Sequence, residues 1–305
     1  MDILIFIVSM TALIYGADFI IEESEKIALH YKISPFVIGA TLVALGTSLP
    51  EMAVSMSASL KGSGDIAVAN VIGSTIFNIS LVLAVVFIIS KEIKPSRDLF
   101  AKDSAWALFP ILVFILMGID GKINAVDGVL FLILMAAYLT FLIGSNQVEE
   151  IDDELAKEKF AWGKTSLLLL AGFMLTIGGA DFAIDSAGNI AREFGVSEWM
   201  IGLFLVAFGT SLPELTISIK AALNNNADLA IGNIIGSNVA NFTMVLGLSS
   251  IVNTLNVDLS AHFFDIAAAF ILSLMLVFIT ANKLYNKSAG IVLLVVLGLV
   301  IQNGA

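Results

Sequence analysis

Two glutamates stand inside apolar stretches of the chain, in identical local surroundings. The hexapeptide Gly-Thr-Ser-Leu-Pro-Glu occurs twice, and its copies end at Glu51 and at Glu214. A carboxylate within a hydrophobic span is costly and typically marks a functional site. Thr47 and Thr210 lie four residues before the glutamates, so each threonine shares a helix face with its glutamate. Each copy therefore offers a carboxylate and a hydroxyl in one place.

Each copy also carries a proline, Pro50 in the first and Pro213 in the second. A proline within a helix removes one backbone hydrogen bond and clashes with the carbonyl four residues earlier. The carbonyls of Gly46 and Gly209 are therefore expected to lack their helical hydrogen bond. Freed carbonyls at membrane depth need a protein donor, water or a cation. We therefore expect broken helices whose carboxylate, hydroxyl and carbonyl oxygens meet near the membrane midplane.

A second motif, Asn-x-x-Gly-Ser-x-x-x-Asn, follows each copy of the first. Ser74 and Asn78 lie four residues apart on one helix face, and so do Ser237 and Asn241. Neutral oxygens beside two carboxylates suit monovalent ions. The alternative is that small polar residues only allow close helix packing and bonds across helices. The duplication beside an intramembrane glutamate favours the ion site.

The predicted ligands are all oxygen atoms. Hard oxygen ligands suit Ca²⁺ and Na⁺, and Ca²⁺ takes about six to eight of them. The chain has no cysteine, and its two histidines, His30 and His262, lie near the ends of apolar stretches. The absence of nitrogen and sulfur ligands argues against zinc or copper.

The composition identifies the class of protein that must position these residues. Of the 305 residues, 58% are hydrophobic and 13% are charged, and the charged share is about half that of a soluble domain. The net charge of −11 excludes a basic surface for nucleic acid. Because a membrane span needs about 20 apolar helical residues, we expect an all-α integral membrane protein with ten transmembrane helices. The ten stretches are 2–21, 33–60, 66–90, 104–120, 125–144, 163–185, 196–222, 228–253, 261–282 and 288–302.

The chain contains an internal repeat. Residues 38–81 and 201–244 align without a gap, and 21 of the 44 positions are identical, so a five-span unit is duplicated. Because five is odd, the second unit enters the membrane from the opposite side, which makes an inverted repeat of the kind found in many secondary transporters. We expect a first repeat at 1–145, an acidic linker at 146–162 and a second repeat at 163–305.

The basic residues predict the orientation. One set of alternate loops holds only Lys61, Lys122 and Arg192, and the other set holds the remaining twelve of the fifteen Lys and Arg residues. The positive-inside rule then places both termini outside the cell and the 145–162 loop in the cytoplasm of a multi-pass cell-membrane protein. The acidic run in that loop is interpreted as a solvated linker in preference to a regulatory cation site.

The repeated GTSLPE, followed each time by GS-x-x-x-N, resembles the α-repeats of the cation/calcium antiporter superfamily, and of the prokaryotic sodium/calcium exchangers in particular. The likeness covers nearly the whole chain and implies alternating access, with Ca²⁺ and Na⁺ competing for overlapping sites. It implies that Ca²⁺ is held by Glu51, Glu214, Thr47 and Thr210. It implies that Na⁺ or shared sites are completed by Ser48, Ser211, Ser74, Ser237, Asn78, Asn241 and the carbonyls of Ala44 and Ala207.

One position departs from part of that superfamily. Some archaeal and potassium-dependent relatives have Asp where this chain has Asn241. Asn78 and Asn241 are both amides, so the predicted site has two carboxylates and not three. A site with two carboxylates weakens the case for K⁺ co-transport.

The predicted function is Na⁺/Ca²⁺ antiport that exports Ca²⁺. A proton/Ca²⁺ antiporter is the alternative, because the same two glutamates can carry protons. An ion channel usually needs an oligomeric or continuous pore, whereas an inverted repeat with a buried double-glutamate site indicates a carrier. An intramembrane enzyme is disfavoured because there is no His-Glu-x-x-His motif. We expect transported Ca²⁺ and Na⁺ in place of a cofactor, a lipid bilayer as partner, and no nucleic-acid or protein partner.

Overall fold

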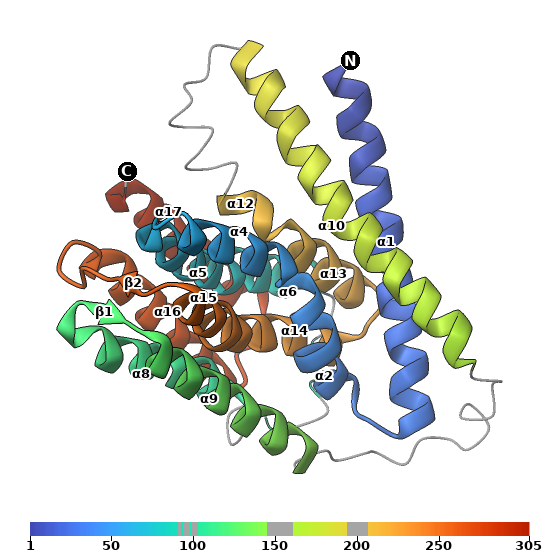
Figure 1. Ribbon diagram of the computed structural model, residues 1–305. Coiled ribbons are helices and arrows are strands. Elements are labelled where there is room, and N and C mark those ends of the chain that lie inside the picture. The colour runs from blue at the N-terminus through green and yellow to red at the C-terminus, as the bar shows by residue number, and fades with distance from the viewer. Residues whose placement is uncertain are drawn as a thin grey trace.

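The computed structural model describes residues 1–90, 103–144, 161–193 and 207–304, together with 93, 95 and 98. The described chain is almost entirely helical (Figure 1). The α-helices are α1 (Asp2–Tyr31), α2 (Pro35–Ile38), α3 (Ala44–Thr47), α4 (Leu49–Leu60), α5 (Gly64–Phe77), α6 (Ala84–Ile89), α8 (Phe109–Met117), α9 (Ala125–Gly144), α10 (Trp162–Glu193), α12 (Ala207–Thr210), α13 (Leu212–Leu223), α14 (Ala227–Ala240), α15 (Leu246–Val252), α16 (Phe263–Ala281) and α17 (Lys287–Gly304). Between them lie the π-helical turns η1 (Gly39–Val43), η2 (Asn78–Leu83) and η7 (Asn241–Val245), the 3₁₀ turns η3 (Ser104–Ala107) and η4 (Gly118–Asp120), and the strands β1 (Lys122–Ile123) and β2 (Leu255–Asn256).

The fold is that of a helical membrane protein. Six helices among the described residues are long and apolar enough to cross a membrane, and a bent helix pair makes a seventh. Two shorter apolar helices, Ser104–Asp120 and Lys287–Asn303, accompany them. In the part of the chain that the structure describes, the one departure from an all-helical fold is the antiparallel pair of β1 and β2, with Ile123 opposite Leu255. The count of ten transmembrane helices stays a prediction.

Several span boundaries differ from those expected. The helix predicted at 2–21 continues to Tyr31, because the stop signal comes at Lys32, whose left-handed backbone (φ 53°) ends α1. The helix predicted at 163–185 runs on to Glu193. The prediction for 196–222 lies partly outside the described residues.

The expected break in the 33–60 segment is present. The helical run Pro35–Thr47 meets α4 at a bend of 44°. Ser48 at the bend has left the helical region (φ −81°, ψ 7°), and Pro50 sits in the first turn of α4. A proline is tolerated there because the first helical N–H groups have no intrahelical acceptor.

The duplication is repeated in the helix boundaries. Helices α4 and α13 both have 12 residues and begin with Leu-Pro after a serine. Helices α5 and α14 both have 14 residues, and each runs into a π-helical turn that starts at an asparagine, Asn78 or Asn241. The sequence repeat is therefore a repeat of one helical hairpin with its π-turn.

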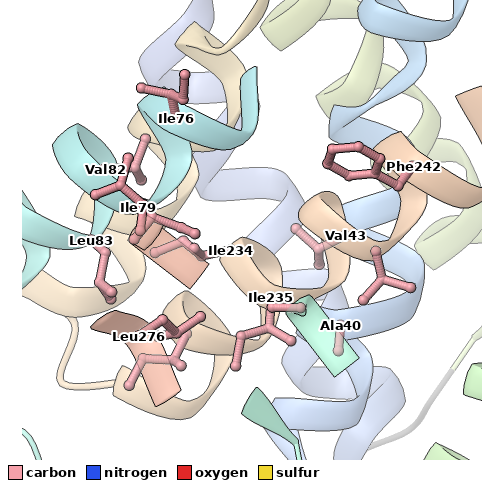
Figure 2. Packing of buried hydrophobic residues seen from close by; sticks show 14 of the residues in the cluster. Ala40, Val43, Ile76, Ile79, Val82, Leu83, Ile234, Ile235, Phe242 and Leu276 are labelled. Atoms are coloured by element: carbon pink, nitrogen blue, oxygen red, sulfur yellow. The ribbon is translucent and has the colours of Figure 1, made fainter. Parts of the chain in front are cut away.

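Helix α14 lies at the centre of the core, where it packs on α2, η1 and α3. In Figure 2, Ile234 and Ile235 of α14 lie between the side chains of η2 and those of η1. Gly236 lets the backbone of α14 approach that of η1, because a Cβ built on this glycine would lie 2.5 Å from the carbonyl oxygen of Ala40. This close packing holds together the two segments that carry the repeated motifs.

Replacing Gly236 by Ala is expected to lower the free energy of unfolding by about 1–3 kcal/mol, the usual cost of overfilling a core. The backbone of Ala40, which the new methyl group would meet, has no side-chain freedom with which to give way. Thermal unfolding in detergent measures the effect. Gly298→Ala is the matched control, because a Cβ there meets no described heavy atom within 4 Å. Equal melting temperatures for the two variants would contradict the packing argument.

Helices α1 and α10 form a separate pair. They cross side by side along much of their length and project beyond the other helices (Figure 1). Gly179 of α10 allows this approach, because its Cβ would lie 2.8 Å from the Ser9 carbonyl oxygen of α1. The pair therefore packs chiefly against itself and touches the core at fewer places.

Candidate ion-binding site

Glu51 is completely buried and is approached by residues from both halves of the chain. Its side chain is 0% exposed. The hydroxyl of Ser74, from α5, lies 3.4 Å from its Oε1 atom and donates to it. Thr210, from the second half, faces the same carboxylate, although its hydroxyl has no hydrogen-bond partner among the described residues. The first carboxylate thus lies where the two repeats meet.

Glu214 occupies the corresponding place in the second repeat and is also 0% exposed. Ser48, from the first half, donates to its Oε1 atom over 3.4 Å. Thr47 and Ser237 lie at the same carboxylate. Glu51 and Glu214 are close enough to interact electrostatically. Each glutamate therefore has a hydroxyl from the other half beside it.

The carbonyl of Ala44 adds a backbone oxygen to this group. It accepts the backbone N–H of Ser48 at 3.0 Å, and the Oγ1 atom of Thr47 lies 3.1 Å away. The Oγ atom of Ser237 lies 3.5 Å from this carbonyl oxygen and 3.3 Å from Oγ1 of Thr47. Ala207 is the first described residue after the gap at 194–206, so its expected carbonyl ligand stays a prediction.

The predicted middle asparagines are both buried. Asn78 donates from Nδ2 to Oδ1 of Asn238 at 3.1 Å, across the two repeats. Asn241 has no partner for either side-chain atom among the described residues. Asn241 follows Ser237 by four residues, about one helical turn, so it lies on the same face of the continuous α14–η7 segment as Ser237.

Several buried oxygens at this place have no hydrogen-bond donor among the described residues. They are Oε2 of Glu51, Oε2 of Glu214, Oδ1 of Asn78, Oδ1 of Asn241, Oγ1 of Thr210 and Oγ of Ser211. Buried oxygens of this kind normally have a partner, and two uncompensated carboxylates in a low-dielectric interior are costly. The described residues contain no group of three or more His, Cys, Asp or Glu side chains placed so that they could hold a metal ion together. The donor set therefore fits a hard cation bound by two carboxylates and neutral oxygens.

Two asparagines that were not assigned to the site support its walls. Asn233 donates from Nδ2 to Ser218 at 3.0 Å, and its Oδ1 atom lies 3.3 Å from Oγ1 of Thr47. Asn70 makes the equivalent bond to Ser55 at 3.0 Å and a second bond to the carbonyl of Glu51 at 3.2 Å. Both asparagines open the repeated Asn-x-x-Gly-Ser motif, which is the sequence signal that points to them.

Replacing Asn233 by Ala is expected to raise the KM for Ca²⁺ about 10-fold, as loss of a group that orients a ligand commonly does. The same change is expected to lower the free energy of unfolding by about 1–3 kcal/mol, because the buried hydroxyl of Ser218 loses its donor. Flux measurements and thermal unfolding test the two effects. Asn303→Ala, on the exposed end of α17, is the control. An unchanged KM would show that Asn233 does not position Thr47.

A multi-pass helical membrane protein that encloses two carboxylates and a set of neutral oxygens belongs to the class of ion transporters. Comparison with known proteins identifies the branch of that class. The model of the sodium/calcium exchanger protein family matches residues 1–144 and 164–302. The chain therefore belongs to the sodium/calcium exchanger family, a family of transporters and not of enzymes.

Relatives align over almost the full length. The chain is 38% identical to the uncharacterized membrane protein MJ0091 of Methanocaldococcus jannaschii, over 95% of this chain and 93% of that protein. It is 34% identical to the putative antiporter CaxA of Alkalimonas amylolytica, over 94% and 93% of the two chains. The structure is similar to a solved structure of the sodium-calcium exchanger NCX_Mj, with a TM-score of 0.85 at 34% identity, covering 100% of this chain and 99% of the other. The resemblance to prokaryotic sodium/calcium exchangers is thus confirmed, and with it cation/Ca²⁺ antiport as the general activity.

Proposed function

We propose that the protein exchanges Na⁺ for Ca²⁺ by alternating access and exports Ca²⁺. The observation that carries the proposal is the pair Glu51 and Glu214, each fully buried and each beside a hydroxyl from the opposite repeat. Two ionised glutamates balance the charge of one Ca²⁺. Because both halves contribute, the site changes when the halves move relative to each other, which is what alternating access requires.

The ligands are assigned by their chemistry and their place. Glu51, Glu214, Thr47 and Thr210 hold Ca²⁺, for which charged oxygen ligands set the affinity. Neutral oxygens around them serve Na⁺ or are shared by both ions: Ser48, Ser74, Ser211, Ser237, Asn78, Asn241 and the carbonyls of Ala44 and Ala207. Na⁺ and Ca²⁺ then exclude each other, because they draw on overlapping oxygens.

The proposed topology has ten transmembrane helices in two inverted repeats, 1–145 and 163–305, joined by a cytoplasmic linker at 146–162. The equal lengths of α4 and α13, and of α5 and α14, support the repeat. The uneven distribution of Lys and Arg supports extracellular termini in the cell membrane. A cysteine-accessibility scan at both chain ends and at Asn124 tests the orientation in intact cells.

Proton/Ca²⁺ antiport is the second candidate, because Asn78 and Asn241 leave the site with two ionisable groups, and both can carry protons. The serine and threonine hydroxyls beside the glutamates favour Na⁺. Proteoliposomes separate the two candidates. We expect an imposed Na⁺ gradient to drive Ca²⁺ uptake at uniform pH, and a pH gradient without Na⁺ to drive none. Uptake that follows the pH gradient alone would replace Na⁺ by H⁺ as the coupling ion.

A further inference from the structure

Two polar contacts tie α1 to the second half of the chain. The Nζ atom of Lys220, in α13, lies 2.8 Å from Oδ1 and 3.0 Å from Oδ2 of Asp18. The side chains of Lys220 and Asp18 are 27% and 30% exposed. Asn226, in the turn after α13, donates to the carboxylate of Glu25 at 2.7 Å. Both contacts lie on the face of α1 that packs along α13 and hold it to the second half of the chain.

The repeat-related positions cannot make the same contacts. At the repeat offset of 163, Asp18 corresponds to Asp181, but Lys220 corresponds to Ser57. Glu25 corresponds to Gly188 and Asn226 to Ser63, so that pair is also missing: Gly188 has no carboxylate and the smaller hydroxyl of Ser63 replaces the amide. The structure has the same asymmetry, because α1 packs along α13 whereas α10 makes no extended contact with α4 among the described residues.

We propose that the Asp18–Lys220 ion pair, together with the Glu25–Asn226 hydrogen bond, is a one-sided latch that stabilises the conformation in which α1 is closed on α13. This inference rests on the proposed alternating access. In an inverted repeat the opposite conformation is reached when the halves exchange their arrangements, and there α10 would close on α4. Asp181 would then meet Ser57, and no ion pair would form. The latch therefore biases the equilibrium toward one conformation.

The size of the bias follows from the exposure of the pair. A partly exposed ion pair is modest in strength, and its loss is expected to shift the ratio of the two conformations about two- to five-fold. By the predicted orientation, Lys220 and Asn226 lie toward the cytoplasm. The latch then holds the cytoplasmic side closed, so that loss of the latch favours access from that side.

The sequence makes a direct test convenient, because the chain has no cysteine. Spin labels on Val8→Cys and Leu223→Cys, at side chains that are 59% and 58% exposed, report the distance between α1 and α13 by pulsed electron paramagnetic resonance. We expect Lys220→Ser, which installs the residue of the other repeat, to raise the population of the separated conformation about two- to five-fold. Asp18→Asn is expected to do the same, and the two changes together are expected to add nothing further.

Moving the lysine to the other repeat is the matched control. Ser57→Lys in the Lys220→Ser background gives Asp181 a possible lysine partner in α4. The population of the separated conformation is therefore expected to rise above that of Lys220→Ser alone. Unchanged distance populations in Lys220→Ser, or fully additive effects of Lys220→Ser and Asp18→Asn, would overturn the latch. These distances are measured without ion flux, so their outcome is independent of whether Na⁺ is the coupling ion.

A cross-link tests whether the contact opens during transport. Asp18→Cys and Lys220→Cys joined by a short bifunctional maleimide are expected to arrest Ca²⁺ exchange while Ca²⁺ binding persists. The same variant without the cross-linker is expected to transport. Ca²⁺ exchange at an unchanged rate after complete cross-linking would contradict the latch. A wild-type chain that does not bind Ca²⁺ would instead contradict the proposed function.

Discussion

Glu51→Gln and Glu214→Gln are each expected to reduce Ca²⁺ exchange by more than about 100-fold, because loss of a charged ligand exceeds the 10- to 100-fold cost of losing a group that only orients one. Glutamine keeps the size of the side chain and the oxygen that accepts from Ser74 or Ser48. It removes one of the two charges that balance Ca²⁺. Calcium flux into proteoliposomes measures the loss.

The fold is expected to survive both changes. Each glutamate has a buried Oε2 atom without a partner among the described residues, and removing a buried charge of this kind does not break an ion pair. The melting temperature of the ion-free protein is therefore expected to stay equal or rise. Glu22→Gln, at an exposed position of α1, is the control and is expected to leave exchange unchanged. Exchange within a few-fold of wild type in either site variant would refute the site.

Asn241→Asp is expected to tighten Ca²⁺ binding at least 10-fold and to lower the maximal rate of exchange. Charge count at the ligands tunes Ca²⁺ affinity, and the change adds a third carboxylate to a site with two. Because neither side-chain atom of Asn241 has a partner among the described residues, the change breaks no hydrogen bond seen there. A more tightly held ion leaves more slowly, so KM and the maximal rate are expected to fall together.

Asn78→Asp is the informative comparison for that variant. Asn78 donates to Oδ1 of Asn238, and an aspartate would lose this donor and place two acceptors against each other. Both variants add a buried carboxylate, but only the Asn78 variant loses a hydrogen-bond donor, so it is expected to be less stable than the Asn241 variant by about 1–3 kcal/mol. Calorimetric Ca²⁺ titration and thermal unfolding of both proteins measure the contrast. Weaker Ca²⁺ binding by Asn241→Asp would place Asn241 away from the ion.

Much of the candidate site could be predicted from the sequence because its signals are local and duplicated. Pro50 forces a break near Ser48 by covalent geometry alone, and the bend is found there. The four-residue spacing of Thr47 and Glu51 gives a shared helix face. The identity of the two motifs then indicates that two such groups meet at the centre of one molecule.

The remaining features depend on tertiary packing, which spacing does not encode. The π-helical turn at Asn241 adds a residue to a helix whose sequence carries no local signal for it. The contact of Asn78 with Asn238 joins residues of different repeats, and so does the contact of Thr47 with Asn233. The apolar run of the first span stops at 21, so hydropathy does not indicate the end of α1 at Tyr31, to which the following polar residues continue the helix. The Asp18–Lys220 pair could not be foreseen, because nothing local to either residue specifies the other.

The central claim is that two carboxylates, one from each repeat, hold a single Ca²⁺ in competition with Na⁺. Calcium titration of the purified protein at several Na⁺ concentrations tests it most directly. We expect one Ca²⁺ per chain, an apparent Kd for Ca²⁺ that rises steadily with the Na⁺ concentration, and no Ca²⁺ binding when both Glu51→Gln and Glu214→Gln are present. Calcium binding that ignores Na⁺, or that persists in the double variant, would contradict it.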